Sequence, residues 1–343
     1  MRVVVTGGAG FIGSHLVEAL LARGESVTVV DNLSTGRFEN LAGVRGHGAL
    51  RLIAADVRDP RMLADAFHDA DCAFHLAAHV GVRRILRHSV ASLLNNVQGT
   101  VTLLERAARQ GTRVLLFSSS EVYGKGHGEI LEERDDLAIG APCIARWSYA
   151  AGKAVDEALA LAYHAEQNLP VTVLRCFNTC GPRQTDRDGM VLPTFVRQAL
   201  AGAPLTVHGD GRQTRCFSYV GDVVRGALML LEAPGSIGEI FNVGNDEEVS
   251  ILELARKIVA RTGSRSPIQV IPYENVFGAT FEDVRRRVPC LAKIRAFVGY
   301  EPRVFLDELL DVTVASIRGG AMAERAAAAA PTPAPAAGPM ERR

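Results

Sequence analysis

Residues 1–31 read MRVVVTGGAGFIGSHLVEALLARGESVTVVD, and this stretch decides how the rest of the chain is interpreted. It starts with a short apolar run and passes through a glycine-rich turn at 6–13 into a helical pattern at 14–23. A second apolar run at 27–30 then ends at Asp31. Strand, glycine turn, helix, strand and acid in this order form one parallel crossover unit. The stretch therefore predicts the opening of a doubly wound α/β sheet.

The glycines of the turn, Gly7, Gly10 and Gly13, suit the binding of a dinucleotide. Glycine tolerates positive φ and lets backbone N–H groups approach a pyrophosphate, and the following helix points its positive end at the phosphates. Asp31 comes eighteen residues after Gly13, where an acid bonds a ribose diol and repels a 2′-phosphate. NAD is therefore favoured over NADP, although Arg37 leaves NADP open. A turn that only packs a helix on a sheet is the less favoured interpretation.

Length and composition describe a globular chain without an obvious charged partner. Its 343 residues predict one large or two modest domains. The 38 basic and 38 acidic residues cancel, so net charge predicts attraction neither to nucleic acid nor to a membrane. No run reaches the roughly 18 apolar residues of a membrane span, and the apolar N-terminus lacks a small-residue cleavage site. We expect a cytoplasmic protein.

The six cysteines contain no CxxC pair. This spacing is not typical of a disulfide or zinc framework, and we expect reduced, buried thiols and no metal site.

Alternating elements predict the architecture. Strand-like runs lie at 2–5, 27–30, 50–54, 72–76, 113–117 and 171–176, and helical patterns at 12–23, 60–69, 91–110 and 149–168. Such alternation is typical of a parallel sheet with helices on both faces, a Rossmann-type fold that binds ligands beyond the carboxyl ends of its strands.

The alternation breaks near residue 180, which predicts a division of the chain. We assign 1–180 to a dinucleotide-binding domain that 218–243 rejoins. The segments 181–217 and 244–318 form a smaller, mixed α/β lobe that binds the substrate. The alanine- and proline-rich residues 321–343 are expected to be a disordered tail, because they cannot bury a core.

Two later motifs carry chemistry. Ser118-Ser119-Ser120-Glu121 ends the fifth strand, and Tyr149 and Lys153 lie four residues apart on one helical face. A free phenol has a pKa of about 10, but a nearby ammonium and a positive nicotinamide ring favour the phenolate. We therefore expect Tyr149 to act as general base for an alcohol proton as hydride leaves to NAD, with the Ser119 hydroxyl on the same oxygen.

At this point the chain resembles the extended short-chain dehydrogenase/reductase family, in its nucleotide-sugar epimerase, dehydratase and decarboxylase branch. The resemblance covers about 1–315 and includes TGGAGFIGSH (6–15), SSSEVYG (118–124), YAAGK (149–153), RCFNTCGPR (175–183) and RRRVP (285–289). It implies a homodimer through the helices at 91–110 and 149–168.

The resemblance also implies binding roles. NAD would contact Gly7, Gly10, Phe11, Ile12, Gly13, Asp31, Asn32, Asp56, Val57, Leu76, Ala77, Ala78, Asn96, Ser118, Tyr149 and Lys153. A UDP-sugar would contact Ser120, Glu121, Asn178, Arg183, Arg215 and Arg287. Arg215 and Glu121 would join Tyr149, Lys153 and Ser119 in catalysis.

The residues around Glu121 distinguish between reactions. The Ser-Glu pair before Val-Tyr-Gly is most similar to the corresponding sequence of UDP-glucuronate decarboxylases. By contrast, 4,6-dehydratases carry an Asp-Glu pair where this chain has Ser120 and Glu121. The resemblance implies oxidation of UDP-glucuronate at C4, loss of carbon dioxide and re-reduction to UDP-xylose. If Glu121 only caps a backbone N–H, the alternative is a UDP-glucose or UDP-glucuronate 4-epimerase. A non-catalytic NAD-sensing protein is less favoured, because Tyr149 and Lys153 are both present.

Overall fold

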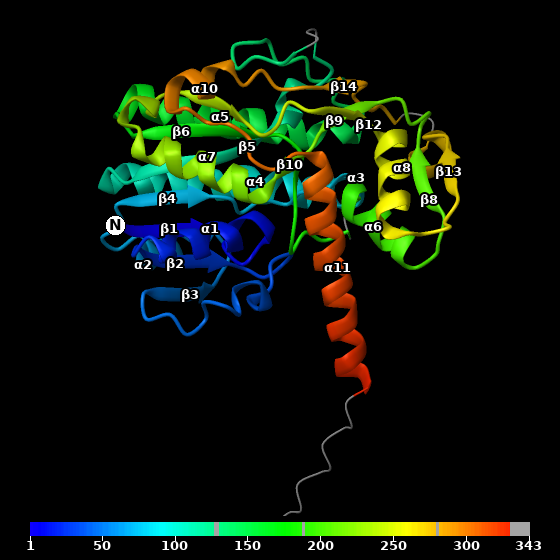
Figure 1. The fold of residues 1–343 in the computed structure, drawn as a ribbon. Helices are drawn as coiled ribbons and strands as arrows, with labels where there is room; N and C mark the ends of the chain where they lie inside the picture. The colour runs from blue at the N-terminus through cyan, green and yellow to red at the C-terminus, as the bar shows by residue number, and fades with distance from the viewer. Residues whose placement is uncertain (127–129, 187–188, 279–280, 330–343) are drawn as a thin grey trace, which may run out of the picture.

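A seven-stranded parallel sheet forms the centre of the computed structural model, which describes residues 1–126, 130–186, 189–278 and 281–329, with side chains through residue 320. The strand order is β3-β2-β1-β4-β5-β6-β11 (Figure 1). The strands are β1 (Arg2–Thr6), β2 (Ser26–Asp31), β3 (Leu50–Ala54), β4 (Cys72–His75), β5 (Arg113–Ser119), β6 (Val171–Cys176) and β11 (Ile240–Val243). The predicted Rossmann-type fold is confirmed.

Alternate side chains of each strand point into two separate cores. Val3 and Val5 pack in the core that holds the apolar faces of α1 (Phe11–Ala22) and α7 (Val220–Glu232). Val4 packs in the opposite core, which is covered by the helices α2 (Pro60–Ala66), α4 (Ser89–Gln110) and α5 (Ser148–Gln167). Because both faces are buried, the strands read as continuous apolar runs.

The helices predicted beside these strands form, with shifted ends. The helix predicted at 60–69 ends at Ala66, because Asp69 has a φ of 57°, outside the right-handed helical region. Val90, Leu94 and Val155 are exposed large apolar residues of α4 and α5. A dimer through these helices stays a prediction.

A smaller lobe lies beyond the carboxyl ends of the strands. It contains α6 (Val191–Leu200), α8 (Ile251–Thr262) and the parallel pair β8 (Leu205–His208) and β13 (Ile268–Ile271). Beside it runs a three-stranded sheet ordered β12 (Glu248–Ser250), β9 (Thr214–Cys216) and β14 (Arg286–Arg287). Its register places Arg287 next to Arg215.

The remaining elements are short connections. They are α3 (Val82–Arg87), α9 (Glu274–Phe277), β7 (Thr179–Cys180), β10 (Ser218–Tyr219), and the 3₁₀ turns η1 (Phe38–Leu41), η2 (Ser120–Tyr123), η3 (Ala145–Trp147) and η4 (Pro234–Ser236).

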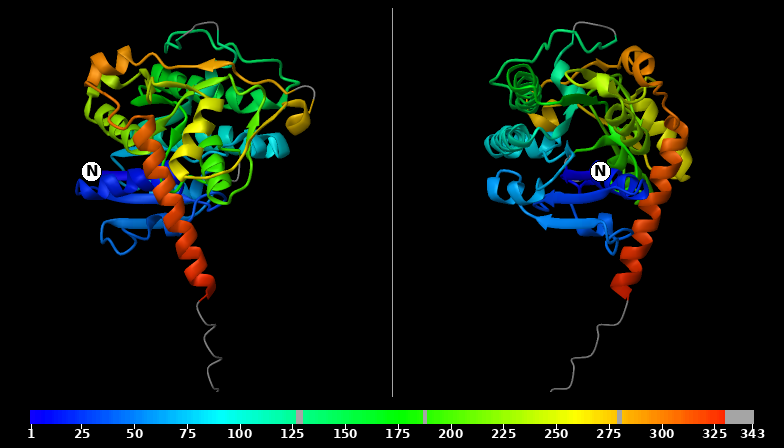
Figure 2. Two further views of the ribbon diagram at one scale, coloured as in Figure 1. Left: turned by 45° about the vertical axis from the view of Figure 1, so that its right-hand side comes forward. Right: turned by 90° about the vertical axis from the view of Figure 1, so that its left-hand side faces the viewer.

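Two parts of the predicted division need correction. Within 244–318, α10 (Ala292–Val298) buries Ile294 in the core of the large sheet instead of the lobe, because this position faces β11. The predicted tail at 321–343 is helical over its first part: α11 (Leu306–Ala329) continues to Ala329 and projects from the body (Figures 1 and 2). Alanine has the highest helix propensity, so a helix can propagate without a core. Residues 330–343 lie outside the described part of the chain. The other domain limits stay predictions.

The structure can be compared with two further expectations, one on the cysteine thiols and one on membrane-spanning helices. All six cysteines are free, but Cys143 is exposed, so the expectation of uniformly buried thiols is wrong there. Among the described residues, no helix combines the length and apolar character needed to cross a membrane.

A buried ion pair fixes α5 against the sheet. Arg175 of β6 donates to both carboxylate oxygens of Glu157, the shortest contact being 2.7 Å, and the Ser118 hydroxyl donates to the same carboxylate at 2.5 Å. Both charged side chains are almost fully buried. The pair therefore positions the helix that carries Tyr149 and Lys153.

We expect Glu157→Ala to lower the free energy of unfolding by about 3–5 kcal/mol, because it leaves the Arg175 guanidinium buried without its carboxylate. Denaturant unfolding measures this loss. As a control, Glu166→Ala on the exposed face of the same helix should change stability by less than about 0.5 kcal/mol. Equal effects of the two variants would contradict a structural role for the pair.

Candidate active site

The glycine turn after β1 leaves no room for side chains. A Cβ on Gly13 would lie 2.2 Å from the Gly7 carbonyl oxygen, and one on Gly7, whose φ is +72°, would lie 2.8 Å from the Ala77 nitrogen. The turn thus brings the start of α1 against the end of β1, with the backbone N–H groups of the helix start directed outward. This cradle fits a dinucleotide pyrophosphate.

A cleft at the strand ends contains this cradle. It encloses about 980 Å³ of space not filled by atoms, open solvent included. Of the residues predicted to contact NAD, those that line it are Gly7, Gly10, Phe11, Ile12, Gly13, Asp31, Asn32, Val57, Leu76, Ala77, Ala78, Ser118, Tyr149 and Lys153. The structure brings these residues together, and we call the space the cofactor cleft.

Asp31 is held rigidly at the end of β2. Its carboxylate accepts the backbone N–H groups of Ala9 at 3.0 Å and Leu33 at 2.8 Å. Burial raises the pKa of Asp31, while the two hydrogen bonds oppose this rise. The fixed carboxylate fits the predicted recognition of a ribose diol. Arg37 is exposed and does not line the cleft.

Two of the predicted cofactor residues do not line the cofactor cleft. Asp56 is paired with Arg58 at 2.7 Å, which holds the pKa of its carboxyl well below the usual range. Asn96 is buried and bonds the backbone of His79, accepting from its N–H at 2.7 Å and donating to its carbonyl at 3.1 Å. It therefore orients the loop after β4 from behind the cleft wall.

Tyr149 and Ser119 meet, and several groups act on the pKa of the phenol. Burial raises the pKa of Tyr149, and the negative charge of Glu121 raises it further, whereas a hydrogen bond with Ser119 lowers it. The net effect of these groups is a raised pKa, and the lowering expected from Lys153 together with a bound nicotinamide stays a prediction. The Lys153 ammonium donates to the Phe117 carbonyl at 3.0 Å and lies 3.2 Å from Asp156.

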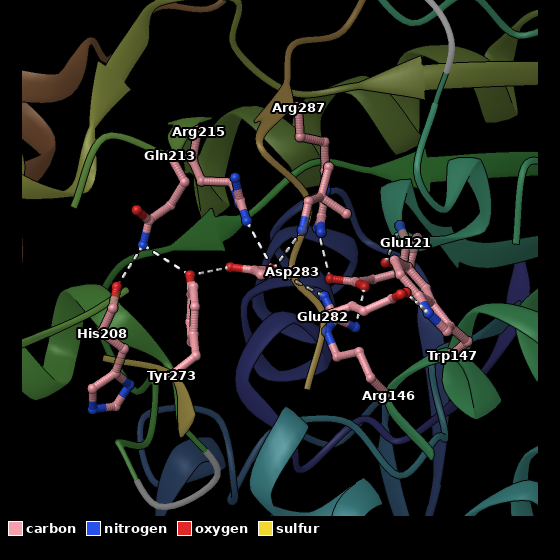
Figure 3. A network of polar contacts seen from close by, with 12 residues as sticks. Glu121, Arg146, Trp147, His208, Gln213, Arg215, Tyr273, Glu282, Asp283 and Arg287 are labelled. Carbon is pink, nitrogen blue, oxygen red and sulfur yellow. Dashed lines mark hydrogen bonds and ion pairs between the residues drawn. The ribbon is translucent and has the colours of Figure 1, made fainter. Parts of the chain in front are cut away.

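A second cleft lies between the sheet and the smaller lobe. It encloses about 1170 Å³ of space not filled by atoms, open solvent included, and we call it the substrate cleft. Glu121 lines it and accepts two arginine hydrogen bonds of 2.6 Å, one from Arg146 and one from Arg287 (Figure 3). The two guanidinium groups hold the pKa of Glu121 well below its usual range, although burial opposes this. The Glu121 carboxylate therefore binds two arginine side chains, which differs from the alternative in which it only caps a backbone N–H.

Arg215 belongs to the same polar network. It donates to Asp283 at 3.1 Å, and Asp283 also accepts the Tyr273 hydroxyl at 2.7 Å (Figure 3). Burial lowers the pKa of Arg215, and its neighbour Arg287 lowers it further. Asp283 lies 3.6 Å from Arg146 and thereby links the two halves of the network.

Of the other three residues predicted to bind the substrate, only one lines the substrate cleft. Asn178 lines the substrate cleft and donates to the Cys216 carbonyl at 2.8 Å. Ser120 is buried at the start of η2 and lines neither of the two clefts. Arg183 lines neither of them, because it donates to Glu18 at 2.6 Å and to Ser14 on the back of α1.

Sequence reasoning missed three members of the network. Arg146 lies three residues before Tyr149, and this spacing was the available signal for it. Asp283 and Tyr273 come from a segment more than a hundred residues further along the chain, and neither lies in a recognisable motif. Tertiary structure alone brings them to Arg215.

Comparisons with known proteins give the following likenesses. The profile described as the NAD dependent epimerase/dehydratase family matches residues 3–244. A UDP-N-acetyl-alpha-D-glucosaminuronate decarboxylase of Bacillus cytotoxicus is 40% identical over 91% of this chain and 96% of its own. UDP-glucuronic acid decarboxylase 1 of Danio rerio is 39% identical over 91% of this chain and 72% of its own.

Solved structures agree with these likenesses. The structure of UDP-glucuronic acid 4-epimerase from Bacillus cereus, in complex with UDP-glucuronic acid and NAD, superposes with a TM-score of 0.84. It is 29% identical and covers 93% of this chain and 99% of its own.

We expect Gly13→Ala to abolish retention of NAD, because the added Cβ collides with the Gly7 carbonyl oxygen. Cofactor content after purification and the rise in melting temperature on adding NAD measure the effect. Gly46→Ala, where a Cβ meets nothing within 4 Å, is the matched control and should bind NAD normally. Normal NAD binding by Gly13→Ala would show that the cradle is misidentified.

Proposed function

The chain belongs to the NAD-dependent epimerase/dehydratase family of nucleotide-sugar-modifying enzymes, and from this premise we propose that it decarboxylates a UDP-glycuronate. The substrate that we favour is UDP-glucuronate and the product UDP-xylose. The reaction would consist of oxidation at C4, loss of the C6 carboxyl group as carbon dioxide, and re-reduction at C4. NAD, when bound, supplies a hydride acceptor, a positive nicotinamide ring and, later, the returned hydride.

The charge balance of the substrate cleft supports an anionic substrate and carries the proposal. The charged lining residues among those described are Arg83, Arg146, Arg215 and Arg287, opposed by Glu121 and Asp283. This leaves an excess of two positive charges in a partly buried cleft, where charges interact more strongly than in water. A uronate carboxylate and a diphosphate together carry three negative charges, which are opposite in sign to that excess, and Arg side chains bind both groups through paired N–H donors.

The place of Tyr149 supports the oxidation step. Its phenol lines the cofactor cleft, and the charge of Glu121, which lines the substrate cleft, acts on it. Tyr149 would take the proton of the C4 hydroxyl, with Ser119 bonded to the same phenol oxygen. Because the pKa of Tyr149 is raised, the positive charge of the bound nicotinamide would be needed before the phenol releases its proton.

Loss of carbon dioxide follows from the ketone at C4. The carboxyl carbon C6 is then β to a carbonyl group, so breaking the C5–C6 bond leaves its electron pair in an enolate. The hydroxyls of Tyr149 and Ser119 would donate hydrogen bonds to the enolate oxygen. Arg146 and Arg287, aligned on Glu121, would orient the departing carboxylate. Neither arginine serves as proton donor, because guanidinium stays charged at working pH.

The enolate would then take a proton at C5 from water, which restores the ketone. The hydride would return to C4, and the Tyr149 phenol would give its proton back to the C4 oxygen.

The named relatives support decarboxylation and leave the substituent at C2 to experiment. One acts on an N-acetylated UDP-uronate and the other on UDP-glucuronic acid. The likeness to the 4-epimerase structure keeps epimerisation as the alternative.

Incubation of the purified protein with UDP-glucuronate, followed by proton NMR and bicarbonate assay, tests the proposal. We expect a UDP-pentose and one equivalent of carbon dioxide. UDP-N-acetylglucosaminuronate, tested in parallel, would show which C2 substituent the cleft accepts. Formation of UDP-galacturonate without carbon loss would contradict decarboxylation and assign the 4-epimerase reaction.

Glu121→Gln should retain NAD and the first oxidation but slow carbon loss by about 10²-fold, because the neutral amide no longer aligns two guanidinium groups. Single-turnover analysis with quenched samples separates the two steps. Glu282→Gln is the matched control, since Glu282 faces Trp147 and Lys125 instead of the cleft. Equal rates of carbon loss in Glu121→Gln and in the wild type would return Glu121 to a structural role.

A further inference from the structure

Asp156 is the third member of a row of side chains on one face of α5. Tyr149, Lys153 and Asp156 follow one another at intervals of four and three residues, which is helical spacing. The Asp156 side chain is 0% exposed, and its Oδ2 lies 3.2 Å from the Lys153 Nζ. The function proposed above makes no use of this carboxylate.

A carboxylate this deep needs partners, because removing its charge from water is costly. Burial raises the pKa of Asp156, and the neighbouring Lys153 and Thr100 of α4 oppose this rise, although neither carboxylate oxygen has a hydrogen-bond partner of good geometry among the described residues. Thr100 lies 3.2 Å from the Nε2 of His75, but burial lowers the pKa of His75 to about 3. The histidine is therefore neutral at working pH and does not balance the carboxylate, so Lys153 supplies the balancing charge.

We propose that Asp156 is a positioning residue that binds the Lys153 ammonium in a buried ion pair, withholds part of its positive charge from the Tyr149 phenol, and so sets the pH at which the phenol loses its proton. The proposal rests on the role of Tyr149 as general base. It adds a carboxylate whose effect opposes that of the lysine beside it.

The groups that face Tyr149 come from four elements. Glu121 of η2, Asp156 of α5 and Cys176 of β6 raise the pKa of the phenol, and the hydrogen bond with Ser119 of β5 lowers it. Glu121 is already balanced by two arginines. Asp156 is balanced by Lys153, which lines the same cleft as Tyr149, so removing the Asp156 charge also leaves this ammonium uncompensated. Both consequences act in one direction and lower the pKa of Tyr149.

Asp156→Asn tests this in the holoenzyme through the pH dependence of kcat. We expect the acid limb of the profile to move to lower pH, so that below the wild-type midpoint the variant turns over faster than the wild type. A variant with only structural damage would be slower at every pH. An acid limb at the wild-type position would overturn the proposal.

A second readout needs no turnover. Ultraviolet difference titration reports phenolate formation, and subtracting the same titration of Tyr149→Phe isolates the signal of Tyr149. In the Asp156→Asn background we expect this phenolate to form at lower pH than in the wild type. An unmoved titration would overturn the proposal even if no UDP-sugar were ever decarboxylated, so its failure is distinct from failure of the proposed function.

Three further variants separate charge from packing. Asp156→Glu keeps the charge and should leave the acid limb near the wild-type position; a limb moved as far as in Asp156→Asn would exclude charge as the cause. Asp156→Ser, smaller and uncharged, replaces the Asn variant if that protein folds poorly. Asp311→Asn makes the same chemical change at an exposed position of α11 and should leave both titrations unchanged.

Discussion

Burial of the Tyr149 phenol is the constraint to which the rest of the site responds. Tyr149 is half-buried and lines the cofactor cleft; burial raises the pKa of its phenol, and the charge of Glu121 adds to that rise. The site can use the phenol as a base only if other groups supply positive charge or hydrogen bonds to its oxygen. Ser119 provides a hydrogen bond, Lys153 is largely committed to Asp156 and Phe117, and the remaining positive charge has to come with the cofactor. In the proposed reaction, proton removal would thereby be coupled to occupancy of the cofactor cleft.

The substrate cleft differs from the surroundings of Tyr149, because its lining carries an excess of cationic side chains. Neighbouring strands β9 and β14 place Arg215 beside Arg287, an arrangement that is repulsive until anions are present. Glu121 and Asp283 relieve this repulsion within the protein, and each contacts more than one cation. The two acids hold the guanidinium groups in place but do not neutralise all of them. In the proposed function, a substrate with a carboxylate and a diphosphate would supply the opposite charge. The charges that would position this substrate would therefore also favour it over neutral sugars.

The residues that sequence reasoning found were those linked by local geometry. The glycine turn and Asp31 lie within one crossover unit, and Tyr149 and Lys153 share a helical face, so spacing alone placed them in one cleft. Arg183 was misplaced because its motif gives a strand end but not the direction of a long side chain, which turns to Glu18. Asp283 and Tyr273 depend on how the lobe closes over the sheet, which no local pattern specifies. The first part of the alanine-rich tail was misjudged because its helix requires only intrinsic propensity.

Rapid mixing of the holoenzyme with UDP-glucuronate tests the central claim that the Tyr149 phenol removes the C4 proton of the bound sugar. The observable is the transient absorbance of reduced nicotinamide, compared between the wild type and Tyr149→Phe at several pH values. The account predicts a transient in the wild type that forms faster as pH rises, and a loss of about 10²-fold or more in its rate in the variant, with UDP-glucuronate still bound. A transient of equal rate in Tyr149→Phe would contradict the account.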